Sequence, residues 1–194
     1  MSKGEETRLN ILRNAFGLIY RNSYQATSID DILATTKVTK GAFFHHFSNK
    51  EEMGLAMIKE VMMPGMSSSL MIPLAAAKDP IDEIYHMMQM ILNDTEHFDV
   101  RYGCPAMNLV EEMAPLNSAF KKELARILNR FRNGLKANIT RAIESGRIRD
   151  DHHADDIAMF IVTGYSGIRN MGKIYGRSCY KSYLLSLKIY LDSL

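Results

Sequence analysis

The segment over residues 27–50, TSIDDILATTKVTKGAFFHHFSNK, constrains the fold of this chain more than any other. Ser28 is followed within three positions by two acidic residues, an arrangement typical of a helix N-cap with carboxylates in the first turn. Thr39 is placed to cap a second helix, and Ser48 or Asn49 to cap a third. Because these helix starts follow one another closely, the segment predicts short helices joined by tight turns.

The second of these helices carries basic, hydroxyl and aromatic side chains. A helix-turn-helix places a recognition helix of this kind in the major groove of DNA. Residues 1–50 hold seven Lys or Arg and four acids, which leaves a net charge of +3 besides His45 and His46. We therefore predict a helix-turn-helix DNA-binding domain over residues 1–50, with the motif at about residues 29–48.

Apolar residues recur at intervals of three and four through most of the chain, which is the spacing of a helix face. Leu12, Phe16 and Ile19 begin this pattern. Pro64 is expected to stop or kink a helix that runs to about Met63, because proline lacks a backbone N–H. No convincing strand, repeat or low-complexity tail interrupts the pattern, so we predict an all-α fold of nine to ten helices.

The composition is that of an ordinary globular chain, since 46% of its 194 residues are hydrophobic and 24% are charged. No apolar run approaches the ~20 residues that span a bilayer, and the N-terminal MSKGEETR lacks the apolar core of a secretory signal. Two cysteines are too few for a disulfide framework. These features predict a cytoplasmic protein with no membrane partner.

The sequence offers little that resembles an enzyme site. No Ser-His-Asp order, phosphate-cradling glycine loop or pair of catalytic carboxylates stands out. His152 and His153, with Asp155 and Asp156, are interpreted as a capped helix start rather than as metal ligands. We therefore predict no catalytic residue, no metal and no cofactor, and a protein that is not an enzyme.

The pattern TSIDDI, then VTKG, then FFHHFSNKEE resembles the TetR/AcrR family of one-component transcriptional regulators over about residues 5–60. GCPAMNLVEEMA and the long helix after it resemble the ligand-binding half of some members. The resemblance implies an all-α homodimer with an N-terminal three-helix head and, over residues 51–194, an effector-binding and dimerisation domain. It further implies a regulator, expected to be a repressor, that a small-molecule effector releases from a pseudo-palindromic operator.

The resemblance also implies which residues contact DNA. The hydroxyls at the first helix start can bind phosphate, Lys40 can reach guanine or phosphate, and Ala42 offers a methyl contact to thymine. Phe43, His46 and Phe47 are expected to hold the head together instead. The expected DNA contacts are Thr27, Ser28, Lys37, Thr39, Lys40, Gly41, Ala42, Phe44, His45 and Lys50.

Three positions depart from the family pattern, namely Ser23, Lys37 and Pro64, and Pro64 lies within the helix that usually links head to body. Ser23 and Lys37 stand where the family usually has glycine, at helix ends that tend toward left-handed backbone. A residue other than glycine is strained there by roughly 1–2 kcal/mol. We therefore expect Lys37→Gly to stabilise the protein by about 0.4–1 kcal/mol.

The remainder of the chain is expected to bind the effector and to form the dimer. Many of its fourteen methionines lie there, and flexible thioethers suit an adaptable apolar pocket. Since no cluster of Arg or Lys accompanies them, we expect a hydrophobic or weakly polar effector. The expected ligand-binding residues are Met62, Met66, Tyr85, Met88, Cys104, Asn108, Phe131 and Tyr165. The expected interface residues of a two-fold dimer are Ile157, Phe160, Ile161, Gly164, Ile168, Tyr183, Leu187 and Tyr190.

Alternative functions remain open at this point. Cys104 lies at a helix start near Arg101, where thiol pKa values fall, so it is either an electrophile-sensing thiol or a small buried residue. A small all-α thiol enzyme would use Cys104 with His86 or His97. A third alternative is a helical ligand-binding protein whose head no longer reads DNA.

Overall fold

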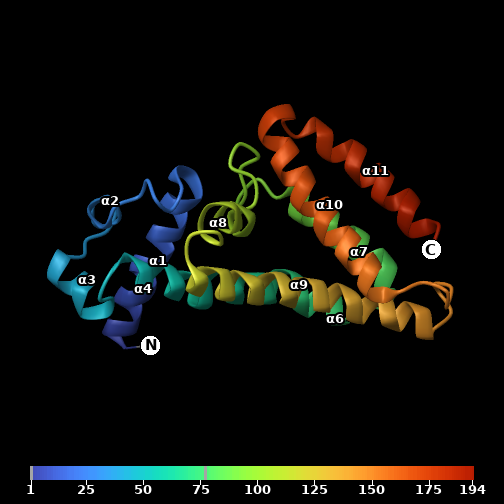
Figure 1. Cartoon of the computed structure of the whole chain (residues 1–194), viewed down its shortest axis with the longest axis horizontal. Coiled ribbons are helices and arrows are strands. Elements are labelled where there is room, and N and C mark those ends of the chain that lie inside the picture. Colours follow the sequence, from blue (N-terminus) through green and yellow to red (C-terminus); the bar gives the residue numbers. More distant parts are fainter. Residues whose placement is uncertain (1, 77) are drawn as a thin grey trace. The chain divides into compact units, whose positions relative to one another are not determined.

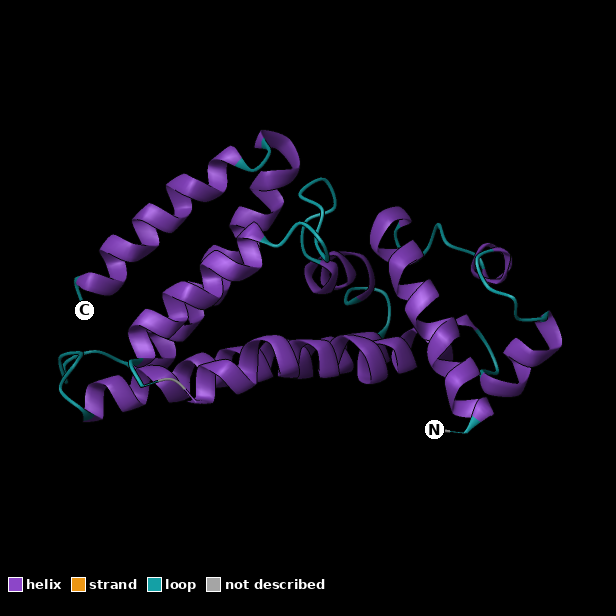
Figure 2. Ribbon diagram, turned by 180° about the vertical axis from the view of Figure 1, so that it is seen from behind, coloured by secondary structure: helices purple, strands orange, loops and turns teal. Residues whose placement is uncertain are grey.

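The computed structural model describes residues 2–76 and 78–194, and within these ranges the chain is helical and contains no strand (Figure 1, Figure 2). None of the helices in these ranges is long and apolar enough to cross a membrane. The α-helices are α1 (Lys3–Asn22), α2 (Ile29–Ala34), α3 (Lys40–His46), α4 (Lys50–Met57), α5 (Met63–Met66), α6 (Ile72–Ala76), α7 (Pro80–Asn93), α8 (Pro105–Met113), α9 (Ser118–Glu144), α10 (Ala154–Tyr175) and α11 (Ser178–Asp192), and the π-helical turns are η1 (Ile58–Met62) and η2 (Ser67–Met71). Because α4 to α6 form one unbroken helical run, the described ranges hold nine helices, which confirms the predicted all-α fold.

The described residues form two compact units. The head unit comprises residues 2–66 and Pro105–Ile127, so α8 and the first part of α9 belong to it together with the N-terminal helices. The body unit comprises residues 67–104, apart from residue 77, and Leu128–Leu194. The run from α4 to α6 and helix α9 each contribute residues to both units.

One apolar core holds the head unit together, and α1, α2, α3, α4, α8 and α9 all contribute to it. Its buried residues are Ile11, Leu12, Ala15, Ile19, Tyr24, Ile32, Phe43, Phe47, Met53, Ala56, Met57, Ile58, Leu109, Met113, Phe120, Leu124 and Ile127. Gly54 allows a close contact within this core, because a Cβ there would lie 2.7 Å from a Phe120 carbon and 2.8 Å from a Tyr24 carbon. The core therefore combines the N-terminal helices with a segment much further along the chain.

The helix starts that the sequence predicts from cap residues are present. The side chains of Ser28, Thr39 and Asn49 each accept the backbone N–H three residues further on, which satisfies amides that have no partner within the helix. Pro80 is the first residue of α7, as expected for a residue whose missing N–H costs nothing at that position.

Of the two outcomes predicted at Pro64, a stop or a kink, the stop is wrong, because the helical run continues from Lys50 to Ala76. The π-helical turns η1 and η2 stand on either side of the proline. At the end of η1 the N–H of Met63 donates to the carbonyl of Ile58, one residue further back than in an α-helix. This wider turn relieves the clash between a proline ring and the carbonyl four residues earlier, so the helix passes the proline.

In the body unit, α10 and α11 approach closely because tyrosines of α11 lie against glycines of α10. A Cβ at Gly164 would lie 2.8 Å from the Tyr183 hydroxyl oxygen, and a Cβ at Gly172 would lie 2.5 Å from that of Tyr180. Arg177, in the turn between the two helices, donates to two carbonyls at the C-terminal end of α7. These contacts join α7, α10 and α11 within the body unit.

Ser23 is the only described residue other than glycine that has a positive φ, at 75° with ψ at 161°. The departure expected at Ser23 is therefore confirmed, whereas the left-handed backbone expected at Lys37 is wrong. The reason lies just before Lys37, where the N–H groups of Thr35 and Thr36 each donate to a carbonyl three residues back. Helix α2 thus ends in tight right-handed turns and needs no left-handed residue.

We predict that Ser23→Gly raises the free energy of unfolding by about 1 kcal/mol, because a non-glycine residue in this backbone region is strained by about 1–3 kcal/mol. Part of that gain is offset by the flexibility of glycine in the unfolded chain and by the loss of the 3.5 Å hydrogen bond from the Ala26 N–H to the Ser23 hydroxyl. Urea unfolding followed by circular dichroism measures the difference.

The matched control is Lys37→Gly, which we now expect to lower the free energy of unfolding by about 0.4–1 kcal/mol, because it only adds freedom to the unfolded chain. Stabilisation by the Lys37 substitution, or a loss of stability from Ser23→Gly, would contradict the backbone assignment.

Candidate nucleic-acid interface

Local hydrogen bonds fix the start of α2. The Ser28 N–H donates to an Asp31 carboxylate oxygen at 2.8 Å, and the Asp31 N–H donates to the Ser28 hydroxyl at 3.0 Å, which closes a capping box. These hydrogen bonds from Ser28 lower the pKa of Asp31, so its carboxylate stays charged at neutral pH. The first helix of the motif is therefore held in place before any partner binds.

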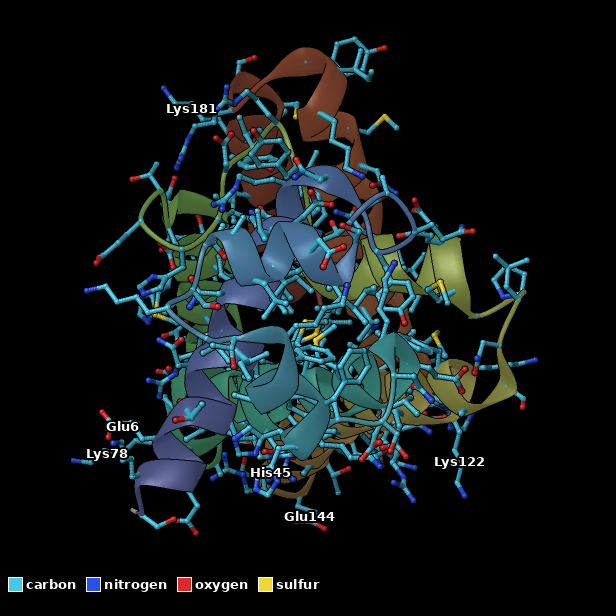
Figure 3. All side chains as sticks on the ribbon, turned by 90° about the vertical axis from the view of Figure 1, so that its left-hand side faces the viewer. Glu6, His45, Lys78, Lys122, Glu144 and Lys181 are labelled. Atoms are coloured by element: carbon cyan, nitrogen blue, oxygen red, sulfur yellow. The ribbon has the colours of Figure 1, made fainter. Side chains whose placement is uncertain are left out.

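Helix α3 has one face in the core and the opposite face in solvent. Phe43 and Phe47 are 0% and 1% exposed, as predicted for residues that hold the head together. The predicted DNA contacts on α3 and at its cap are the exposed residues Thr39, Lys40, Gly41, Phe44 and His45, with Ala42 half-buried beside them. His45 is labelled among the side chains in Figure 3. Ser28 and Lys37 are also exposed, so most of the predicted contacts are accessible.

An ion pair joins the two helices of the motif across the turn. The ammonium of Lys40 lies 2.9 Å from a carboxylate oxygen of Asp30, and both side chains are largely exposed. Exposed ion pairs contribute little to stability, typically about 0–1 kcal/mol. A phosphate oxygen can therefore replace Asp30 as the partner of Lys40 at small cost.

Two of the predicted contacts, Thr27 and Lys50, have partners inside the head. Thr27 is 1% exposed and its hydroxyl donates to the Ser23 carbonyl at 2.7 Å. This corrects the expected phosphate contact of that hydroxyl, because its hydrogen closes the loop before α2. The Lys50 ammonium lies 4.4 Å from the Tyr24 ring centroid and 3.4 Å from the Gln25 carbonyl oxygen, and partial burial lowers the pKa of Lys50.

Arg8 fastens the end of α3 to α1 and to η1. Its guanidinium donates to the His46 carbonyl at 2.9 Å, lies 4.4 Å from the Phe47 ring centroid, and forms an ion pair with Glu60 at 2.7 Å. Partial burial lowers the pKa of His46, and the charges of His45 and Arg8 lower it further. His46 is thus built into the head in its neutral form, in keeping with its predicted structural role.

The predicted ligand-binding residues divide between the two units. Met62, Met66 and Asn108 belong to the head unit, and each is half-buried. The body unit contains the other five, which are Tyr85, Met88, Cys104, Phe131 and Tyr165. Within the body unit, Cys104, Phe131 and Tyr165 lie together.

Tyr165 is the centre of this cluster in the body unit. Its ring meets Phe131 edge-on at 5.9 Å between centroids, and it forms a hydrogen bond with the thiol of Cys104, which is 7% exposed. Burial, together with Cys104, raises the pKa of Tyr165 well above its ordinary value. Cys104 is therefore a buried residue paired with a phenol.

Arg169, which was not among the residues predicted from sequence, lies in the same cluster. It is 1% exposed, donates to the Gly103 carbonyl at 3.0 Å, and its guanidinium carbon lies 4.9 Å from the Phe98 ring centroid and 5.9 Å from that of Tyr165. A sequence signal existed, because Arg169 continues the series Ile157, Ile161, Tyr165 at intervals of four. A charged residue within an apolar helix face is unusual and points to a specific role.

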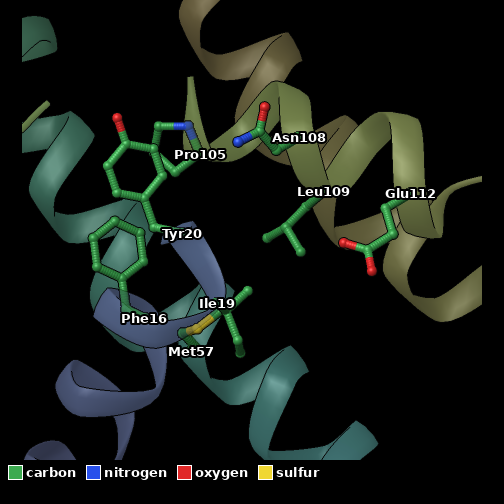
Figure 4. A pocket seen from close by; sticks show the side chains of 8 residues that line it. All are labelled: Phe16, Ile19, Tyr20, Met57, Pro105, Asn108, Leu109 and Glu112. Carbon is green, nitrogen blue, oxygen red and sulfur yellow. The ribbon is translucent and has the colours of Figure 1, made fainter. Parts of the chain in front are cut away.

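A small cleft lies within the head unit, between α8 and helices α1 and α4 (Figure 4). Its cavity measures only about 10 Å³ and is lined by Phe16, Ile19, Tyr20, Met57, Pro105, Asn108, Leu109 and Glu112. Among the predicted ligand-binding residues only Asn108 lines it. Drug-sized ligands occupy pockets of roughly 300–1,000 Å³, so the cleft is small for an effector.

The structure divides the predicted dimer residues into buried and exposed sets. Ile157, Ile161 and Leu187 are at most 4% exposed inside the chain, so they are core residues and the prediction is wrong for them. Gly164 is covered by Tyr183 of the same chain. Ile168, Tyr183 and Tyr190 are half-buried. Both sides of α10 are apolar, so the sequence does not distinguish the buried side from the exposed one, and several of the predicted residues lie on the buried side.

Exposed residues, most of them apolar, lie along α10 and α11. We call the exposed residues Phe160, Thr163, Gly167, Met171, Ile174, Leu185 and Ile189 the outer stripe. Nothing lies within 4 Å of the position that a Cβ at Gly167 would occupy. Gly167 therefore leaves an opening where a helix of another molecule can approach closely.

Among the residues near the start of α10, Asp155 forms ion pairs. Asp155 is paired with Arg132 and Lys136, and His152 lies 3.8 Å from Asp151. The pairing with Arg132 lowers the pKa of Asp155. Within the described ranges, no group of three or more His, Cys, Asp or Glu residues is arranged to hold a metal ion.

Comparison with known proteins agrees with this geometry in both halves of the chain. Residues 11–57 match the family described as bacterial regulatory proteins, tetR family, and residues 80–183 match the tetracyclin repressor-like C-terminal domain. An uncharacterized HTH-type transcriptional regulator of Lactococcus lactis is 31% identical over 69% of this chain and 68% of its own length. The HTH-type transcriptional repressor DhaR of a Mycobacterium species is 25% identical over 82% of this chain and 79% of its own.

Solved structures share the whole fold. A TetR transcriptional regulator from Chloroflexus aurantiacus matches 98% of this chain and 96% of its own, with a TM-score of 0.88 and 25% identity. A regulator of the TetR family from Cytophaga hutchinsonii matches 100% of this chain and 97% of its own, with a TM-score of 0.88 and 21% identity. The arrangement of helices in each half is therefore an established one.

We predict that the free energy of unfolding falls on acidification from pH 7 toward pH 5, partly through His46. Because the folded pKa of His46 is lowered, the unfolded chain takes up this proton first as the pH falls below about 6.5. The contribution of neutral His46 to the free energy of unfolding is therefore complete above that pH and is lost as the pH falls below it. Replacing His46 by Gln should make the decline shallower, measured by urea unfolding at each pH, whereas an unchanged slope would contradict this origin.

Proposed function

Because this chain belongs to the tetR family of bacterial regulatory proteins, we propose that it is a DNA-binding repressor released from a pseudo-palindromic operator by a small effector. The observation that carries this proposal is the solvent face of α3, which follows a capped turn and exposes Lys40, Gly41 and His45 together. A recognition helix needs such a face to enter the major groove.

The proposed DNA contacts fall into two kinds. Lys37 and Lys50 would position the head on phosphates, which adds affinity but no sequence information. On α3, Lys40 would reach guanine or phosphate, and Ala42 with Phe44 would offer apolar contacts to thymine methyl groups. Gly41 would allow the helix backbone to come close to the DNA.

We predict that two substitutions in one ion pair change DNA affinity in opposite directions. Lys40→Ala should weaken binding about tenfold or more, because it removes one charge-assisted contact worth about 1.5–3 kcal/mol. Asp30→Asn should strengthen binding, because it removes a carboxylate that competes with DNA for Lys40. Selection of genomic fragments with purified protein supplies the duplex, and fluorescence anisotropy at a fixed salt concentration measures affinity.

This experiment separates the proposal from its alternatives. A helical ligand-binding protein that no longer reads DNA would select no fragment and would show no salt-dependent affinity. Equal affinities for the two substituted proteins would instead show that Lys40 faces neither phosphate nor base.

We further propose that the outer stripe of α10 and α11 is the interface of a homodimer. Seven large apolar side chains on these two helices and their ends are strongly exposed, namely Met159, Phe160, Met171, Ile174, Tyr175, Leu185 and Ile189. An exposed apolar surface of this kind is typical of an interaction site. Members of this family act as dimers, and two recognition helices would then occupy successive major grooves.

We predict that Gly167→Leu converts the dimer to a monomer without loss of helix content. Its side chain would fill the opening left by Gly167 on the outer stripe, where space within the chain itself is free. Analytical ultracentrifugation measures the association, and circular dichroism measures the helix content.

The matched control lies one turn away on the same helix. Gly164→Ala places a Cβ against Tyr183, so it should lower the thermal midpoint of unfolding while the folded protein stays dimeric. A dimer that survives Gly167→Leu unchanged would place the interface elsewhere.

For the effector, we propose the cluster around Tyr165 in the body unit as part of the binding site. Phe131, Phe98 and the thiol of Cys104 favour a small, hydrophobic or weakly polar molecule. The buried guanidinium of Arg169 adds one cationic donor that can orient a polar oxygen of that molecule.

We also propose that the protein is not an enzyme and that it works in the cytoplasm, where a regulator meets DNA. A thiol enzyme would need a base beside Cys104, whereas the hydrogen-bond partner of this thiol is Tyr165. A phenol with a raised pKa is protonated at neutral pH and cannot act as that base.

A further inference from the structure

The carboxylate of Glu112 binds two consecutive backbone amides just after α1. Glu112 lies on α8, and its two oxygens accept the N–H groups of Tyr24 and Gln25 at 2.9 Å and 2.6 Å. Hydrogen bonds to an ionised acceptor are roughly twice as strong as neutral ones. These two amides follow directly on Ser23, the residue with the strained backbone, so one side chain holds the chain at the point where it reverses.

Other groups converge on the same loop. The Lys50 ammonium lies over the Tyr24 ring and close enough to Glu112 to interact with its charge. The Tyr24 ring also packs edge-on against Phe120, with 4.9 Å between centroids. Burial, with the charges of Glu51 and Glu112, raises the pKa of Tyr24 to about 12. The loop after α1 is thus clamped by α4, α8 and α9 within the head unit.

This loop leads directly into the DNA-reading motif. Ser28, the cap of α2, comes three residues after Gln25, and the Thr27 hydroxyl closes the turn between them by donating to Ser23. Beyond α2, the ion pair between Asp30 and Lys40 connects the start of α2 to α3. A shift of the two amides therefore changes where both helices of the motif begin.

Glu112 also lies beside the apolar contact between α8 and α1. The cleft described above lies there, with Leu109 and Asn108 of α8 opposite Phe16 and Ile19 of α1 (Figure 4). Leu109 is buried in the core of the head unit, so apolar packing and the carboxylate of Glu112 together hold this part of α8 to α1 and to the loop after it.

We propose that Glu112 is a positioning residue through which α8 sets the orientation of the DNA-reading helices. This inference rests on the proposed function as a DNA-binding regulator, and it identifies a regulatory contact of that site. Helix α8 begins at Pro105, the residue after Cys104 in the body unit, so a rearrangement around the proposed effector cluster is passed covalently to α8. Release of the two amides then lowers operator affinity.

The test compares Glu112→Gln with two controls on the unlabelled operator fragment selected above. Glu144→Gln removes an exposed carboxylate at the end of α9, and Gly164→Ala destabilises the body unit without touching the head. We expect Glu112→Gln to weaken operator binding about tenfold, since a lost charge-assisted hydrogen bond has this effect. Its affinity for random duplex should change less than about twofold, because the phosphate contacts remain.

A second measurement needs no DNA. Amide protons that donate to a carboxylate resonate downfield, so the ¹H–¹⁵N signals of Tyr24 and Gln25 should move upfield in Glu112→Gln and stay in place in both controls. Glu112→Asp keeps the charge but draws it back by one methylene, so it should also move the same two signals. This second variant decides the contact if Glu112→Gln does not fold.

The outcomes are distinct. Unmoved amide signals overturn the contact, and moved signals with unchanged operator affinity overturn its role in positioning. If Glu112→Gln and Gly164→Ala lose operator affinity equally, general destabilisation explains both losses. That result also overturns the positioning role of Glu112. If the unsubstituted protein selects no fragment, the proposed function fails first, and the amide signals still report whether Glu112 makes the contact.

Discussion

Helices α2 and α3 keep their places through capping hydrogen bonds and a shared core, because neither is long enough to be stable alone. They contain six and seven residues, whereas isolated helices shorter than ~12–15 residues are marginal in water. Ser28 and Thr39 satisfy amides at the helix starts, and Phe43 and Phe47 anchor α3 in the core. The reading face is thus oriented by whatever completes that core, including residues of α8 and α9.

Features that depend on near neighbours in sequence could be predicted, and features that depend on distant ones could not. A cap at Ser28 requires only the residues of the next turn, so the start of α2 was visible in the sequence. The contact between Glu112 and Tyr24 joins residues 88 positions apart, and no sequence pattern in either segment predicts it. The series of residues at intervals of four could have drawn attention to Arg169, but its partner on a distant loop could not be predicted, for the same reason. Nor could the choice between the two apolar sides of α10.

The two errors in backbone geometry have a common cause. Members of the family usually have glycine at two helix ends. A residue with a positive φ is needed there only where the helix does not end in a tight right-handed turn. At Ser23 it is needed, whereas at Lys37 the right-handed turns of Thr35 and Thr36 remove the need. At Pro64 a widened turn likewise absorbs what an ideal α-helix could not. The residue type restricts which backbone conformations are favourable at such a position. The surrounding packing then decides which of these conformations the chain adopts.

The chemistry of α3 makes the placement of the head unusually important. Gly41, Ala42 and Phe44 bring no hydrogen-bonding side chain to the base edges, so at their positions discrimination would depend on methyl contacts and on DNA shape. Such contacts require the helix backbone to lie close to the DNA, and they weaken steeply when it moves away. A long polar side chain could follow a small displacement of the helix, but an alanine methyl cannot. A recognition face of this kind therefore responds strongly to small shifts of the loop that Glu112 holds, so control through placement suits this chain.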